Sequence, residues 1–168
     1  MPNYRYEEDH PLSDNLYAAI GEMVVQWGHL EDLAGLVTAL LLKTNHFDYR
    51  AVSVNLSTSA KFHALSAVAG EKLSARKAAT LRRISQSAIS KSAERNRIIH
   101  GNWYWGGPGV GPDVAQRFSY SARGKLTQSD ETVSAARVRG FAKEVAQLRR
   151  RLNRALSREK FYRSPSLP

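Results

Sequence analysis

The stretch from Glu94 to Trp103, ERNRIIHGNW, gathers the side chains of this chain that are best suited to chemistry. Arg95 carries a permanent positive charge and a planar fork of donors that matches the oxygens of a phosphate group. His100 can take up or release a proton near neutral pH. Asn96 could orient either a phosphate or the imidazole ring. These residue types are those of a site that binds phosphate and transfers protons.

The apolar pattern of the helix expected here limits how these side chains can meet. Its buried positions run through Leu81, Ile84 and Ala88, and the same steps lead to Arg95. A guanidinium on a buried face needs a partner, so either a carboxylate meets it or the face opens into a cleft. His100 follows five residues later, about 140° round an ideal helix, and therefore does not share this face.

Two interpretations of these residues stay open. In the structural one, Arg95 forms a salt bridge within the chain and His100 ends the helix, where the helix dipole favours cations. Spacing alone favours that interpretation. In the functional one, Arg95 and His100 converge through the reach of the arginine, distortion of the helix end or a second copy of the chain. Asn96, four residues before His100, shares its face.

Hydrophobic periodicity predicts that most of the chain is helical. A long first helix is expected over residues 13–43, because apolar residues recur three or four apart along it. This stripe consists of Leu16, Ile20, Val24, Trp27, Leu30, Ala34, Val37 and Leu41. Further helices are expected over residues 58–73, 75–100 and 135–159, and residues 44–56 are expected to be loop.

The character of the chain changes between the third and fourth of these helices. The run GGPGVGP predicts a loop, and RFSYSARGKLTQ predicts a short β-hairpin with Arg123 and Gly124 in its turn. Together they occupy about residues 103–131, and the tail, residues 160–168, is expected to be flexible. The fold class is therefore all-α: one domain, residues 1–168, in which a four-helix bundle carries a small β-hairpin insertion.

Arg95 and Asn96, followed by three residues and His100, resemble the R-x4-6-H signature of the HEPN superfamily, in which a polar residue often follows the arginine. The ending ERNRIIHGNW is similar to that of HEPN-like proteins, and the W-x-x-L-E run of the first helix and the four-helix layout agree. The resemblance covers most of the chain apart from the hairpin and the tail. It implies a helical homodimer whose two motifs face each other in a cleft. Many members are metal-independent RNases, often toxins, defence proteins or RNA-processing proteins, and others keep the fold without activity.

The chemistry that this resemblance implies suits the residues. RNA can be cut without a metal because its own 2′-hydroxyl attacks the adjacent phosphorus, so the protein needs only a proton-transfer group and a fixed cation. His100 fits the first role and Arg95 the second, with Asn96 in support. We therefore expect a homodimeric endoribonuclease that needs no cofactor and no metal, with an antitoxin or another acidic protein as a further partner. The alternatives are a HEPN-like module that binds RNA or a protein without cutting, and a dimerisation domain docked on an acidic partner.

The charge of the chain favours a polyanion such as RNA as the partner. The net charge is +10, from 25 Lys and Arg against 15 Asp and Glu. Ten of these basic residues lie between Arg137 and Arg163, a run that is either a solvated helix face or a surface that follows phosphates. The candidate RNA contacts are Arg97, Arg149, Arg150, Arg151 and Arg154.

Four aromatic residues near the insertion allow two interpretations. Trp103, Trp105, Phe118 and Tyr120 could stack on single-stranded bases or cover the end of the core, and we prefer the second for Trp103. The chain has no cysteine, which excludes disulfides and thiolate sites. Its first residues lack the layout of a signal peptide, and no apolar run approaches the ~20 residues of a spanning helix. We expect a soluble, cytoplasmic protein without a membrane partner.

Overall fold

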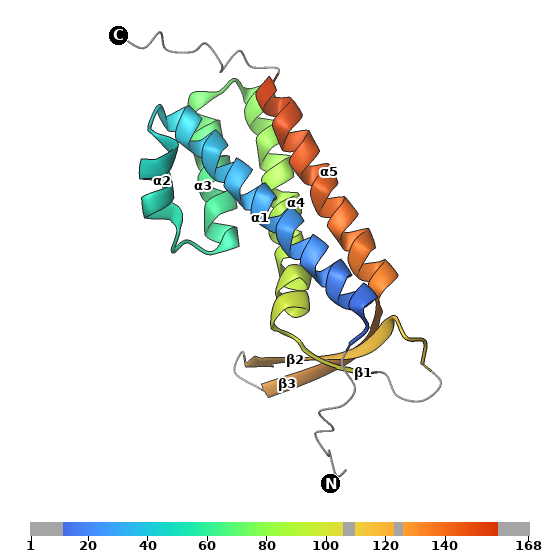
Figure 1. Ribbon diagram of the computed structural model, residues 1–168. Helices are drawn as coiled ribbons and strands as arrows, with labels where there is room; N and C mark the ends of the chain where they lie inside the picture. Colours follow the sequence, from blue (N-terminus) through green and yellow to red (C-terminus); the bar gives the residue numbers. More distant parts are fainter. Residues whose placement is uncertain (1–11, 106–109, 123–125, 158–168) are drawn as a thin grey trace. The chain divides into compact units, whose positions relative to one another are not determined.

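The computed structural model describes residues 12–105, 110–122 and 126–157, and these hold five helices and a three-stranded sheet (Figure 1). The chain divides into two compact units, residues 1–24 with 95–142 and residues 25–94 with 143–168. In chain order the elements are α1 (Asp14–Leu42), α2 (His46–Ser53), α3 (Thr58–Lys72), α4 (Ala75–His100), β1 (Asn102–Trp105), β2 (Val114–Ala122), β3 (Leu126–Ser134) and α5 (Ala135–Ser157).

The expectation of a mostly helical fold is confirmed. α1, α3, α4 and α5 occupy the stretches in which the apolar pattern predicts helices. The described residues hold a fifth helix and a third strand that were not predicted. The single domain over residues 1–168 stays a prediction. None of the helices in the described ranges combines the length and the apolar character that crossing a membrane requires.

The expected loop over residues 44–56 is wrong, because α2 lies within it. Asn45 caps this helix: its side-chain oxygen accepts a hydrogen bond from the backbone N–H of Phe47 at 2.8 Å. The ring of Tyr49 lies over Gly35 of α1. A helix of eight residues is marginal by itself, so α2 depends on such contacts with its neighbours, which a periodicity argument cannot see.

The buried stripe of α1 differs from the predicted one in its first half. Val24 is 44% exposed and Ile20 is half-buried, whereas Ala19 and Met23 are fully buried in their place. From Trp27 onward every predicted position is buried, and Thr38 and Ala39 are buried in addition. Steps of three and four residues are compatible with Ala19 and Met23 as well as with Ile20 and Val24. The prediction chose Ile20 and Val24 because isoleucine and valine are strongly apolar.

In the unit formed by residues 25–94 and 143–168, a carboxylate joins α1 to α3. Glu31 accepts hydrogen bonds from the indole N–H of Trp27 at 2.7 Å, from the ammonium of Lys61 at 2.9 Å and from the hydroxyl of Thr58. Burial raises the pKa of Glu31, but these hydrogen bonds and the charge of Lys61 outweigh it and hold the pKa below its ordinary value. The W-x-x-L-E run therefore ends in a residue that fixes two helices together.

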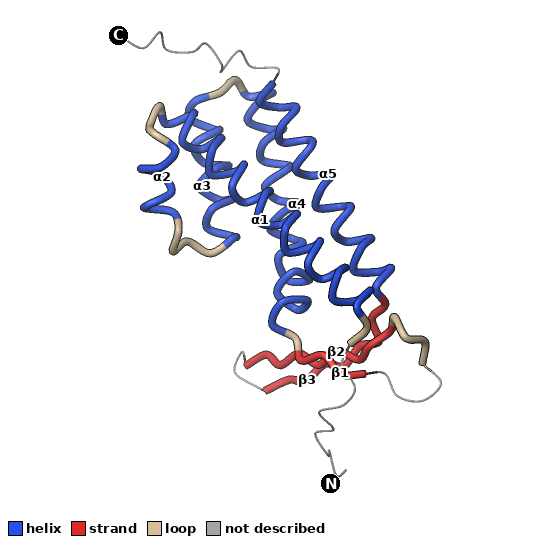
Figure 2. The backbone as a smooth tube through the Cα atoms, viewed as in Figure 1, coloured by secondary structure: helices blue, strands red, loops and turns tan. Residues whose placement is uncertain are grey.

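The predicted hairpin is present as the antiparallel strands β2 and β3, and β1 adds a strand that was not predicted. The insertion is therefore a three-stranded antiparallel sheet in the order β1-β2-β3 (Figure 2). β1 has the sequence NWYW, whose aromatic residues favour strands. It pairs with β2 so that Trp103 faces Arg117, and Arg117 in turn faces Glu131 of β3. The predicted turn at Arg123 and Gly124 and the predicted flexible tail lie outside the described residues.

Candidate functional site

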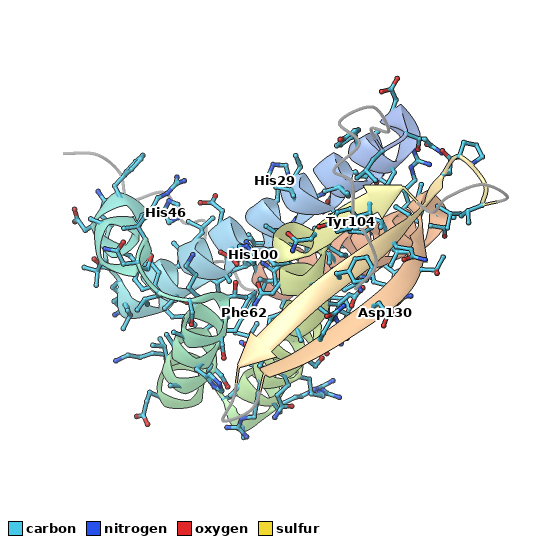
Figure 3. All side chains as sticks on the ribbon, turned by 90° about the horizontal axis from the view of Figure 1, so that it is seen from below. His29, His46, Phe62, His100, Tyr104 and Asp130 are labelled. Atoms are coloured by element: carbon cyan, nitrogen blue, oxygen red, sulfur yellow. The ribbon has the colours of Figure 1, made fainter. Side chains whose placement is uncertain are left out.

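Bonds to the strand that follows fix the end of α4. The backbone N–H of Gly101 donates to the carbonyl oxygen of Arg97, and the indole N–H of Trp103 donates to that of Ile98, both at 2.9 Å. These bonds satisfy two of the carbonyls that a helix leaves without partners at its C-terminus. They hold His100 at the end of α4 (Figure 3). The His100 side chain is exposed.

Arg95 is half-buried and makes its hydrogen bond to a neighbour on the same helix. Its Nη1 donates to Oδ1 of Asn96 at 2.9 Å, while its Nε is buried and has no hydrogen-bond partner among the described residues. No carboxylate of the described ranges forms an ion pair with Arg95. The structural interpretation of Arg95 requires a salt bridge within the chain, and the described ranges contain none. Among the described residues, the Nε of this guanidinium is a donor that no acceptor uses.

The structure brings Arg95 and Asn96 together and leaves His100 about one turn beyond Asn96. Asn96, Arg97 and His100 are all exposed. Among the described residues no hydrogen bond joins His100 to Arg95. Within one chain the two side chains are thus neighbours along a helix and do not form a direct contact.

A buried arginine of β2 packs next to the end of α4, and it was not identified from the sequence. Arg117 of β2 is only 1% exposed, its Nη2 donates to Oε2 of Glu131 at 2.6 Å, and its guanidinium lies 5.5 Å from the centre of the Trp103 ring. A Cβ on Gly101 would lie 2.8 Å from Cγ of Arg117. Arg117 therefore packs against the residue that ends α4. The sequence held one signal for the burial of Arg117. It stands two residues after Ala115 on β2, so both side chains lie on the same side of the strand, and both are buried.

Glu131 neutralises this buried charge. It also accepts a hydrogen bond from Arg137 in the first turn of α5. Burial raises the pKa of Glu131, but the hydrogen bonds and charges of Arg137 and then Arg117 outweigh that effect and hold the pKa below its ordinary value. The buried arginine thus has an ionised partner at neutral pH and serves the structure.

The candidate RNA contacts of α5 belong to the other compact unit. Nη1 of Arg149 lies 2.9 Å from Nδ1 of His29, so this arginine is held against α1. Arg150, Arg151 and Arg154 are exposed. Three of the four predicted residues of α5 are therefore accessible to a partner.

The described aromatic residues of the sheet pack against each other. The rings of Tyr104 and Phe118 meet edge to face, with centroids 5.3 Å apart and an angle of 77° between the ring planes. Trp103 is half-buried against Arg117, which agrees with a role in covering the core. The side chains of Trp105 and Tyr120 lie outside the described ones. In the described ranges no group of three or more histidine, aspartate or glutamate side chains is placed to hold a metal ion.

Comparisons with family models, with curated proteins and with solved structures find no match to this chain.

Proposed function

We propose that the protein is a metal-independent endoribonuclease of the HEPN type that cuts RNA through attack by the substrate's own 2′-hydroxyl. The observation that carries this proposal is the state of Arg95: half-buried, bonded to Asn96 and without a carboxylate partner in the described ranges. Such a guanidinium is suited to bind an anion from outside the chain, and an exposed His100 follows it at the R-x4-H spacing.

In the proposed reaction His100 accepts the proton of the 2′-hydroxyl as its oxygen attacks phosphorus, or donates one to the departing 5′-oxygen. Arg95 binds the non-bridging phosphate oxygens and stabilises the extra negative charge of the transition state. Asn96 orients the guanidinium through the bond that it already makes. The products are a 2′,3′-cyclic phosphate and a free 5′-hydroxyl.

A homodimer is part of the proposal, because Arg95 and His100 do not share a face of α4. A second copy could supply the histidine that completes each site. Support comes from an exposed apolar strip on α1, in the same compact unit as the motif, which consists of Tyr17, Gly21 and Val24. Such a strip is typical of a contact with another helix. Arg97 and the arginines of α5 would bind RNA phosphates, and an acidic antitoxin would be a further partner.

The proposal is tested with Arg95→Ala and His100→Ala on single-stranded RNA in the presence of EDTA. Each should reduce the cleavage rate about 10²–10⁴-fold, because a positioned acid–base group contributes that much. His63→Ala is the matched control: this histidine is exposed on α3 and should leave the rate unchanged. Circular dichroism checks that all three variants fold.

Two results would overturn the proposed enzymatic function: cleavage that requires a metal, or cleavage that persists when the scissile nucleotide is 2′-deoxy. The second candidate function is an RNA-binding module without activity, which the exposed arginines of α5 favour. It is the better description if the wild-type protein binds RNA but leaves it intact.

A further inference from the structure

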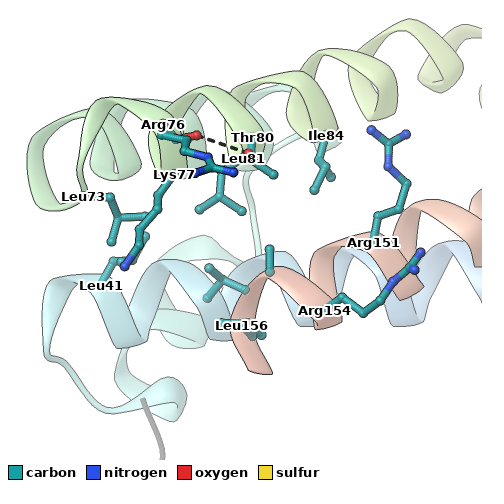
Figure 4. A pocket seen from close by; sticks show the side chains of 12 residues that line it. Leu41, Leu73, Arg76, Lys77, Thr80, Leu81, Ile84, Arg151, Arg154 and Leu156 are labelled. Atoms are coloured by element: carbon teal, nitrogen blue, oxygen red, sulfur yellow. Dashed lines mark hydrogen bonds between the residues drawn. The ribbon is translucent and has the colours of Figure 1, made fainter. Parts of the chain in front are cut away.

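A groove lies between the first three turns of α4 and the end of α5, within the unit formed by residues 25–94 and 143–168 (Figure 4). Its volume is about 450 Å³, within the range of small-molecule sites. Aliphatic side chains from both helices and from α1 line it, among them Val37, Leu41, Leu81, Ile84 and Leu156. The first four are buried and form an apolar floor.

The rim of this groove is cationic. Arg76 and Lys77 of α4 and Arg151 and Arg154 of α5 line it, and no acidic residue is among its described lining residues. Arg151 extends from α5 toward α4 across the opening (Figure 4). In the described ranges, the guanidinium groups of Arg76, Arg151 and Arg154 make no hydrogen bond or ion pair. The groove therefore gathers several positive charges beside an apolar surface.

Two of these cations stand where a helix ordinarily avoids them. Arg76 and Lys77 are in the first turn of α4, which holds no acidic residue. The positive end of the helix dipole lies there and disfavours cations. A bound anion would relieve this repulsion and would interact with the rim arginines at the same time. The electrostatics of the groove thus fit a negatively charged group.

An RNA backbone fits this groove less well than an amphiphile does. A phosphodiester chain would use the cations but has nothing to place on the aliphatic floor, and none of the described lining residues is aromatic and able to stack on a base. We propose that the groove binds a single-chain amphiphile in free solution: an alkyl chain on the apolar floor, with a carboxylate or phosphate head group at the cationic rim. The groove shares Arg151 and Arg154 with the proposed RNA contacts of α5, but the proposal does not depend on Arg95 or His100.

Isothermal titration calorimetry with decyl phosphate and with decanoate, each below its micellar concentration, tests the proposal on the whole chain. Both compounds should bind, and comparing their affinities shows whether the groove prefers a phosphate or a carboxylate head group. Affinity should fall about tenfold from decyl to octyl phosphate, since each buried methylene contributes to binding. Inorganic phosphate alone should bind far more weakly, and decyltrimethylammonium should not bind.

Three variants separate the groove from the general charge of the protein. Arg76→Gln removes one rim charge and should weaken decyl phosphate about tenfold. Thr80→Trp fills the groove from α4 without changing a charge and should abolish binding. Arg82→Gln, on an exposed position of the same helix outside the groove, should change nothing. No binding by wild type, no dependence on chain length, or equal losses in Arg76→Gln and Arg82→Gln would each overturn the proposal.

Discussion

Gly101 is the residue on which the geometry of the helix end depends most closely. A Cβ at this position would lie 2.4 Å from the carbonyl oxygen of Arg97 and 2.8 Å from Cγ of Arg117. The first atom belongs to the backbone and the second to a side chain that is buried and bonded to Glu131. Neither can move away easily, so only glycine fits between the end of α4 and β2.

We therefore expect Gly101→Ala to lower the free energy of unfolding by about 1–3 kcal/mol, the usual cost of forcing extra volume into a packed site. Gly28→Ala is the matched control. Gly28 is exposed in α1, and a Cβ there would meet nothing within 4 Å. Since alanine is the better helix former, this variant should gain about 0.5–1 kcal/mol. Thermal unfolding of both variants measures the two opposite signs. A neutral Gly101→Ala would contradict the packing described for Arg117.

The residues of this region were predictable to different degrees. Arg95, Asn96 and His100 could be found because their types and spacing carry a chemical meaning within one helix. Arg117 could not, because its role depends on partners from two other strands, Trp103 and Glu131. An arginine in a short alternating segment looks like a solvent-facing residue until the strand pairing is known.

Among the secondary-structure elements, the sequence predicted which stretches form helices far better than which faces of the helices pack together. Long apolar periodicity identified α1, α3, α4 and α5, since each buries a continuous stripe. It missed α2, which is held by its cap and by neighbours from α1. It also chose Ile20 and Val24 over Ala19 and Met23, because periodicity does not say which of two adjacent stripes faces a partner.

The connection of α1 to α3 through Glu31 predicts a specific dependence of stability on pH. The pKa of Glu31 is lower in the folded than in the unfolded chain, so its carboxylate stabilises the fold above the ordinary glutamate pKa of about 4.3. That contribution is lost as the pH falls through the lower pKa of the folded state. Glu31→Gln should therefore cost about 1–3 kcal/mol at pH 7, and its difference from the wild type should shrink below pH 4.

Urea denaturation at a series of pH values between 3 and 7 measures this effect. Glu22→Gln provides the matched control, since Glu22 is an exposed residue of the same helix. It should leave both the stability and its pH dependence close to those of the wild type. A constant difference between Glu31→Gln and the wild type at all pH values would show that the ionised form of Glu31 is not what joins the helices.

For the whole molecule, the proposed site requires a second copy of the chain. Light scattering should find a dimer at micromolar concentration, and Val24→Glu should give a monomer, because a charge on the exposed strip of α1 would be buried without a partner. Val52→Glu is the control. Val52 is 77% exposed on α2, in the other compact unit, and the same charge there should leave the dimer intact. If only Val52→Glu dissociates the dimer, the interface includes α2 and not the exposed strip of α1.

The net charge of +10 makes a further prediction about the whole molecule in solution. If the arginines of α5 contact RNA, each contact releases counterions, and the affinity for single-stranded RNA falls with rising salt. Removing Arg150, Arg151 and Arg154 together, as Gln variants, should make the slope of log affinity against log salt concentration less steep by about 2. Lys72, Arg82 and Arg83, which are exposed on α3 and α4, provide a control triple with the same loss of charge. Fluorescence anisotropy at several salt concentrations distinguishes the two triples. If both change the slope equally, RNA responds to the overall charge of the protein, and α5 is a solvated face.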